Sequence, residues 1–69
     1  MITYEPLFNK LEKKKMRPHD LMVLAGVAPN TMTKIRNGKN VSLEVLERFC
    51  RVLECDFKDI VGHVEEKKE

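Results

Sequence analysis

Residues 21–39 decide the fold, and they read LMVLAGVAPNTMTKIRNGK. Gly26 can adopt the left-handed conformation that ends a helix, and Pro29 suits the first turn of the next one, where its missing N–H is not needed. Asn37 and Gly38 then form a turn. An Asn-Gly pair also occurs in β-hairpins, but the flanking residues do not alternate, so a loop between helices is favoured. The stretch therefore predicts two short helices joined by a tight turn.

Apolar residues at helical spacing on either side of this stretch predict three further helices. Pro6 suits the start of the first of them, and Ser42 and Asp56 are typical capping residues for the other two. We therefore expect an all-α, compact bundle of five short helices, at about residues 5–14, 18–25, 29–36, 43–53 and 57–61. The predicted core contains Leu7, Phe8, Leu11, Met16, Leu21, Leu24, Met32, Ile35, Leu43, Leu46, Phe49, Cys50, Leu53, Phe57 and Ile60.

The 69 residues are expected to form a single domain, with about 5–62 ordered and 63–69 a charged tail. Hydrophobic residues make up 42% of the chain and charged residues 35%, which fits a globular domain rather than a disordered one. Neither a signal peptide nor an apolar run long enough to span a bilayer is visible. We therefore expect a soluble, cytoplasmic protein with no membrane partner.

The residue types that catalysis and metal binding require are not grouped in this sequence. No nucleophile lies beside a base, His19 and His63 are at opposite ends of the chain, and neither a phosphate-binding glycine loop nor zinc-ligand spacing appears. Cys50 and Cys55 are expected to be buried free thiols. We therefore expect no enzyme activity, no cofactor or metal, and no small-molecule ligand.

Charge is distributed unevenly along the chain, although the net charge is only +2. Residues 1–41 contain eight basic and three acidic residues, whereas residues 42–69 contain five basic and eight acidic ones. Residues 26–41 contain no acidic residue, and a helix exposed only to water would normally include Glu or Asp. The pattern favours a polyanionic partner; basic faces exposed only to solvent are the alternative. The run Lys13–Lys15 either ends the first helix or contacts phosphate.

Together these features resemble the phage-repressor, or Cro-like (XRE-type), helix-turn-helix family, whose domains are lambda-repressor-like. The resemblance covers about residues 7–61. The residues that carry it are Leu21, Leu24, Gly26, Val27, Pro29, Thr31, Met32, Ile35, Asn37, Gly38, Lys39, Ser42, Leu43, Leu46, Phe49, Cys50, Leu53, Asp56 and Phe57. The family resemblance implies that the helix at 29–36 enters the major groove of double-stranded DNA while the start of the preceding helix lies against a phosphate.

Carried over position by position, the resemblance implies two sets of DNA contacts. Contacts with base edges would come from Pro29, Asn30, Thr31, Thr33 and Lys34. Contacts with phosphates would come from Arg17, Pro18, His19, Asn37, Lys39 and Asn40. The side-chain chemistry agrees, because asparagine pairs with adenine, lysine with guanine, and threonine offers a hydroxyl or a methyl group.

Three positions depart from the family pattern. Met22 stands where the family usually has a small residue, Val23 where a polar residue is usual, and Pro29 where several members carry a base-reading side chain. We expect a repressor-type regulator that occupies an operator; one domain covers only a half-site, so a homodimer on a palindrome is one arrangement. The alternative is a helical module that binds protein, or an antitoxin that also binds a toxin partner.

Overall fold

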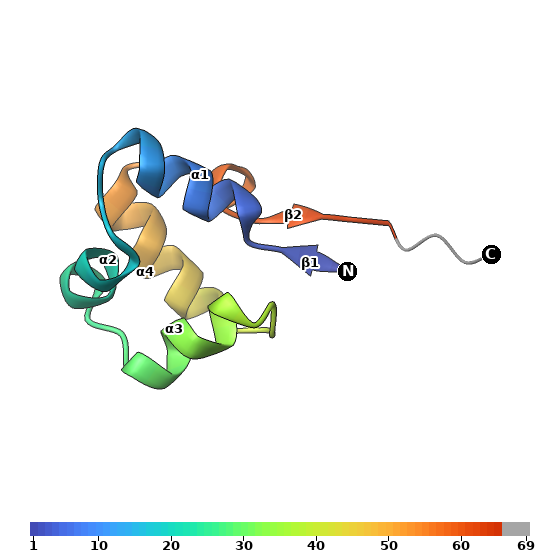
Figure 1. Ribbon diagram of the computed structural model, residues 1–69, viewed down its shortest axis with the longest axis horizontal. Helices are drawn as coiled ribbons and strands as arrows, with labels where there is room; N and C mark the ends of the chain where they lie inside the picture. The colour runs from blue at the N-terminus through green and yellow to red at the C-terminus, as the bar shows by residue number, and fades with distance from the viewer. Residues whose placement is uncertain (66–69) are drawn as a thin grey trace.

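The computed structural model describes residues 1–65 and consists mainly of helices (Figure 1). Residues 1–65 contain four α-helices: α1 (Glu5–Lys13), α2 (Pro18–Ala25), α3 (Pro29–Arg36) and α4 (Leu43–Leu53). In the same part of the chain, a single 3-10 turn, η1 (Phe57–Asp59), follows α4, and there are two short strands, β1 (Ile2–Thr3) and β2 (Gly62–His63). The predicted all-α fold is confirmed, with the fifth helix reduced to one 3-10 turn.

The ends of α2 and α3 follow from backbone chemistry. Gly26 has φ +69° and ψ 35°, and the N–H of Val27 donates to the Met22 carbonyl at 3.1 Å, which ends α2. Pro29 begins α3, and Ala28 before it provides no side-chain cap. Gly38, with φ +71°, turns the chain after α3. The predicted bounds of both helices are therefore confirmed.

Side-chain caps define the starts of α4 and η1, as predicted. The Ser42 hydroxyl oxygen accepts a hydrogen bond from the Val45 N–H at 3.3 Å. Asp56 accepts from the Phe57 N–H at 2.7 Å, and the Asp59 carboxylate accepts from the Asp56 N–H at 3.0 Å. Both segments thus begin where a side chain satisfies a backbone donor that the helix leaves free.

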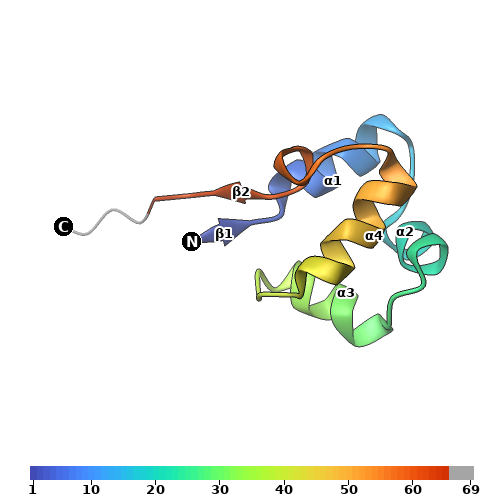
Figure 2. The same ribbon diagram turned by 180° about the vertical axis from the view of Figure 1, so that it is seen from behind.

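Helix α4 packs against α2 and η1, while α1 packs on η1 and α3 on α2 (Figures 1 and 2). The core lies between these elements. Among the described residues it contains Tyr4, Leu7, Leu11, Leu21, Ala25, Met32, Ile35, Leu46, Phe49, Leu53 and Ile60. Phe8, Met16 and Cys50 are partly buried against this cluster.

Three predicted core residues are exposed instead. Leu24 is 63% exposed because α2 turns Leu21 and Ala25, one turn apart, toward α4. Leu43 is 72% exposed because it occupies the first position of α4, outside the stripe that begins at Leu46. Phe57 is 41% exposed, since the single 3-10 turn directs Ile60 into the core instead.

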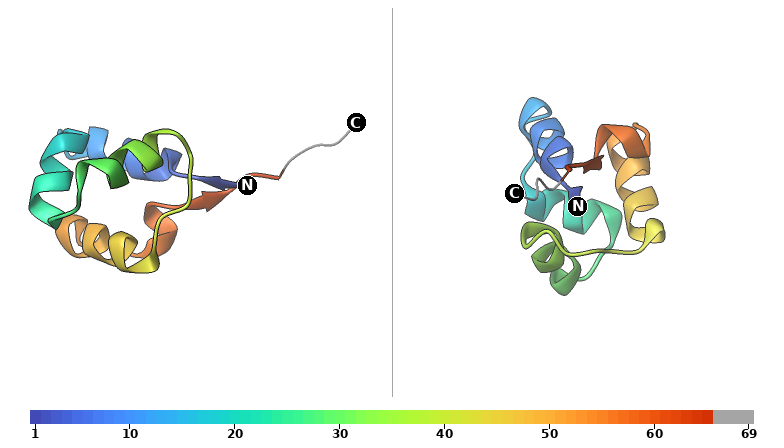
Figure 3. Two further views of the ribbon diagram at one scale, coloured as in Figure 1. Left: turned by 90° about the horizontal axis from the view of Figure 1, so that it is seen from below. Right: turned by 90° about the vertical axis from the view of Figure 1, so that its right-hand side faces the viewer.

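The two strands pair antiparallel, with Ile2 opposite His63 and Thr3 opposite Gly62. The charged tail was expected to begin at residue 63, whereas His63 belongs to β2 and pairs with β1. Residues 66–69 of the predicted charged tail lie outside the described residues. Figure 3 shows the strands on the same side of the helices.

Cys50 and Cys55 are free thiols and half-buried. They lie at the end of α4, where the Cys55 N–H donates to the Cys50 carbonyl at 3.0 Å. Burial, followed by the neighbouring Cys55, raises the pKa of Cys50 to about 11. Within residues 1–65, no helix combines the length and apolar character needed to cross a membrane.

Candidate nucleic-acid interface

Helix α3 presents a polar, basic face to solvent. Met32 and Ile35 are buried and attach the helix to the core. The opposite side carries Asn30, Thr33 and Lys34, all exposed. Asn30 and Lys34 are four residues apart and therefore project from the same face. The helix thus holds two hydrogen-bonding side chains in a fixed relation to each other.

The remaining predicted base-contact residues lie at the borders of this face. Pro29 is exposed at the start of α3, whereas Thr31 is half-buried and lies toward the core side. The Thr33 hydroxyl donates to the Pro29 carbonyl at 3.2 Å. Its proton is thereby engaged, which leaves the oxygen lone pairs and the methyl group for contact with a ligand.

A groove between α2 and α3 brings together residues from both predicted sets. It has a volume of about 300 Å³ and is lined by Pro18, His19, Met22, Pro29, Met32, Thr33 and Arg36. Met22 is half-buried and lines the groove between the two helices, so the structure accommodates this larger residue at the groove wall.

Arg36 was not predicted as a site residue. It is exposed in the last turn of α3 and lines the groove with Pro18 and His19. The available signal was its spacing, because Arg36 is three residues after Thr33 and seven after Pro29 and therefore shares their side of the helix. The groove thus combines an imidazole and a guanidinium at the border of the exposed face.

The start of α2 is arranged around Asp20. The Arg17 backbone N–H donates to the Asp20 carboxylate at 3.1 Å, and Pro18 occupies the first position of the helix. The side chains of Arg17 and His19 are exposed at the same end. This end therefore offers two exposed basic or hydrogen-bonding side chains beside one carboxylate.

The turn after α3 is attached to the N-terminal segment. The Tyr4 hydroxyl donates to the Lys39 carbonyl at 2.7 Å, and the Lys39 N–H donates to the Lys34 carbonyl at 2.8 Å. The side chains of Asn37, Lys39 and Asn40 are exposed. The backbone of the turn is thus held from two sides while its polar side chains remain accessible.

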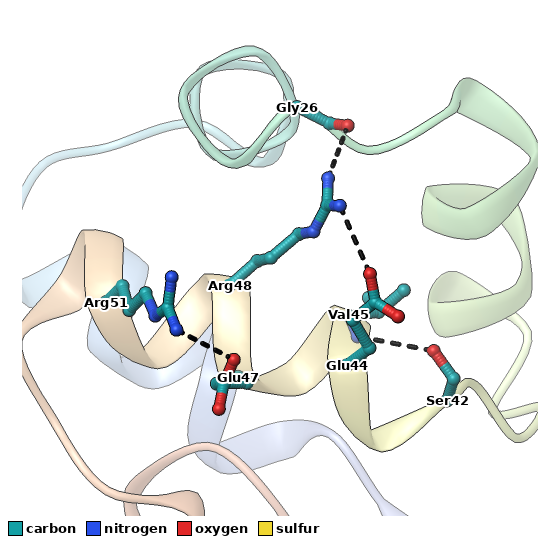
Figure 4. A network of polar contacts seen from close by, with 7 residues as sticks. All are labelled: Gly26, Ser42, Glu44, Val45, Glu47, Arg48 and Arg51. Carbon is teal, nitrogen blue, oxygen red and sulfur yellow. Dashed lines mark hydrogen bonds and ion pairs between the residues drawn. The ribbon is translucent and has the colours of Figure 1, made fainter.

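Arg48 connects α4 to the turn between α2 and α3 (Figure 4). It donates to the Gly26 carbonyl and to the Glu44 carboxylate, each at 3.2 Å. Helical spacing alone places Arg48 on the solvent-exposed side of α4 and cannot reveal this link, because the accepting carbonyl lies on another element. The arginine thereby joins the turn between α2 and α3 to α4.

Ion pairs within residues 1–65 are confined to α4, where Arg48 pairs with Glu44 and Arg51 with Glu47 at 3.1 Å. Lys34, Arg36 and Lys39 have no ion-pair partner in that part of the chain. The positive charge near α3 is consequently available to an external anion.

The model of the Cro/C1-type helix-turn-helix DNA-binding domain matches residues 7–66. The chain belongs to this family. Among solved structures, it is similar to the transcriptional regulator VanUg in crystal form II, with 35% sequence identity and a TM-score of 0.90 over 94% of this chain and 87% of that one. No curated protein gave a significant match. The resemblance expected from residues 7–61 is confirmed, and the chain is a DNA-binding regulator domain.

Proposed function

We propose that this protein is a repressor-type transcriptional regulator that binds double-stranded DNA sequence-specifically, with α3 in the major groove. The observation that carries the proposal is the exposed face of α3, where Asn30, Thr33 and Lys34 project from a segment without a single acidic residue between 26 and 41. A major groove admits one α-helix, and these side-chain types read base edges.

The two sets of side chains have different tasks in this proposal. Asn30 pairs with an adenine, Lys34 donates to a guanine, and Thr33 contacts a thymine methyl. Pro29 and Thr31 lie close to base edges and contribute contact area. Backbone phosphates are contacted by the groups that flank the face: Arg17, Pro18, His19, Asn37, Lys39 and Asn40. Arg36 joins this second set because it lines the groove with Pro18 and His19.

Repression follows from occupancy of an operator. Eight residues of α3 reach only a few base pairs, so a single domain reads a half-site. We infer that two copies bind a palindromic operator, with the half-sites about one helical turn of DNA apart. A protein bound there excludes the transcription machinery by occupying the operator.

Selection of bound sites from a random duplex library tests the proposal. We expect an enriched, two-fold symmetric sequence, bound by two protein molecules in a sedimentation experiment, with an affinity that falls as salt rises. An Asn30→Ala, Lys34→Ala double variant tests base reading directly. Both side chains are exposed and outside the core, so their removal should leave the fold intact. A library that shows no enrichment, or an affinity independent of salt, would contradict the proposal.

A protein-binding role is the second candidate, favoured by two apolar side chains on α2. Val23 and Leu24 are 62% and 63% exposed, although the family usually has a polar residue at the first of these positions. A Val23→Gln, Leu24→Gln variant should retain DNA binding. If it instead retains its fold but loses operator binding or repression, the surface contacts a protein that the function requires.

A further inference from the structure

Three lysines remote from α3 line a second groove, which we call the α1–η1 groove. It has a volume of about 310 Å³ and is lined by Pro6, Asn9, Lys10, Lys13, Lys58 and Asp59. Lys10 and Lys13 are three residues apart on α1 and therefore share a face, and Lys58 belongs to η1, which packs against α1. The fold thus brings ammonium groups from two distant segments of the chain together.

Positive charge exceeds negative charge in this groove, because its lining contains three lysines and one acidic residue. Both ion pairs within residues 1–65 belong to α4. Asp59 is the acidic residue of the lining, and its carboxylate accepts a hydrogen bond from the Asp56 N–H at 3.0 Å. Lys14 and Lys15 follow α1 directly and are exposed, so they extend the positive surface beyond the groove.

The α1–η1 groove and the exposed face of α3 lie on opposite sides of the molecule. In Figures 1 and 2, α1 lies at the top of the view and α3 at the bottom, and the right-hand view of Figure 3 shows the same separation of these two helices. A single straight duplex seated on α3 therefore does not reach the groove.

We propose that the α1–η1 groove holds the phosphate backbone of a second DNA duplex, so that the protein bridges two duplexes. Lysine ammonium groups and an asparagine amide are the donors that typically contact phosphate oxygens. A protein partner fits this lining poorly, since lysine is depleted in protein interfaces and the lining has no aromatic or long aliphatic anchor. The contacts carry no base readout, so any duplex is accepted.

Capture of one duplex by another tests this inference. A biotinylated duplex on beads is loaded with the full chain, washed, and exposed to a fluorescent duplex. The wild type should retain the second duplex, whereas Lys10→Gln, Lys13→Gln, Lys58→Gln should retain about tenfold less, because each lost phosphate contact lowers a salt-dependent affinity. Binding of the first duplex, measured by fluorescence anisotropy, should change by less than about threefold, because α3 is untouched.

Two matched variants control for charge and folding. Lys10→Arg, Lys13→Arg, Lys58→Arg preserves the charge and should still bridge. Lys34→Gln, Arg36→Gln, Lys39→Gln removes the same number of charges from the side of α3 and should weaken the first duplex instead. Circular dichroism melting confirms that all three variants fold.

The bridging inference rests on the proposed function only for the duplex seated on α3. Different experimental results would overturn the bridging and the proposed function. A wild type that binds one duplex but captures no second one overturns the bridging alone. Bridging that survives in the Lys→Gln groove variant also overturns it, because a dimer with two α3 faces would then explain the capture. Binding of no duplex overturns both proposals. If the loaded protein captures polyglutamate but no second duplex, the bridging is overturned and the groove is assigned to an acidic protein.

Discussion

Replacement of Gly26 by alanine tests whether backbone conformation alone ends α2. Gly26 has φ +69°, a region that costs a residue with a Cβ about 1–2 kcal/mol. A Cβ there would lie 3.7 Å from the Arg48 guanidinium, an ordinary van der Waals contact, so no steric clash adds to this cost. The lower freedom of alanine in the unfolded chain offsets about 0.4–1 kcal/mol. We therefore expect a net loss of about 1 kcal/mol, or about 4–8 °C in Tm for a domain of this size.

Gly38 provides the matched control for Gly26→Ala. Its φ is +71°, and a Cβ there would meet no atom within 4 Å, so Gly38→Ala should cost the same amount. Urea denaturation followed by far-UV circular dichroism measures both, and Gly26→Asn should recover part of the loss because asparagine tolerates this conformation. A cost of several kcal/mol at Gly26 alone would refute the reasoning and make space beside Arg48 the decisive factor. No loss at either position would refute the left-handed conformations.

Three further predictions concern the base contacts, a helix cap and a thiol. Lys34→Ala and Asn30→Ala should each cost about 1–3 kcal/mol on a selected duplex and relax specificity at one base pair; uniform weakening on all duplexes would instead indicate phosphate contacts. Ser42→Ala removes the acceptor for the Val45 N–H and should cost about 1 kcal/mol in urea denaturation, whereas an unchanged midpoint would contradict the cap. Because the pKa of Cys50 is raised from 9.0 to about 11, its alkylation at pH 8 should be about tenfold slower in the folded protein than in urea, as measured by mass spectrometry, since the greater nucleophilicity of a thiolate of higher pKa offsets part of its lower abundance. The neutral Cys50 thiol therefore contributes fully to the stability of the fold below pH 9.0, and this contribution is lost as the pH rises through about 11. A Cys50→Ser variant whose stability falls with alkaline pH in the same way as that of the wild type would contradict this.

The bounds of α2 and α3 could be predicted to the residue because each is set by local backbone chemistry. Pro18 and Pro29 occupy first-turn positions that need no N–H, and Gly26 has the conformation in which a Cβ is unfavourable. These constraints act within a few residues along the chain. The residues at and beside each helix end therefore suffice to predict where α2 and α3 begin and end.

The inward faces of the helices were harder to predict because they depend on distant partners. On α2, the spacing of Leu21 and Leu24 is as regular as that of Leu21 and Ala25, and only the packing against α4 decides between them. The pairing of β1 with β2 joins two-residue segments from opposite ends of the chain, and such segments are too short to show alternation. Contacts between residues that are far apart along the chain produce no periodic pattern in the sequence.

The candidate site depends both on local sequence patterns and on contacts between distant residues. The exposed residues of α3 could be predicted from the helical spacing around Met32 and Ile35, whereas the bonds that hold the helix in place could not. An isolated helix of eight residues is marginal in water, so the geometry of α3 depends on its tertiary contacts. The Tyr4 hydroxyl holds the turn after α3 through the Lys39 carbonyl, and Arg48 holds the turn before it through Gly26. Base readout requires side chains fixed to within a fraction of an ångström, so under the proposed function we expect these remote residues to contribute to specificity without touching DNA.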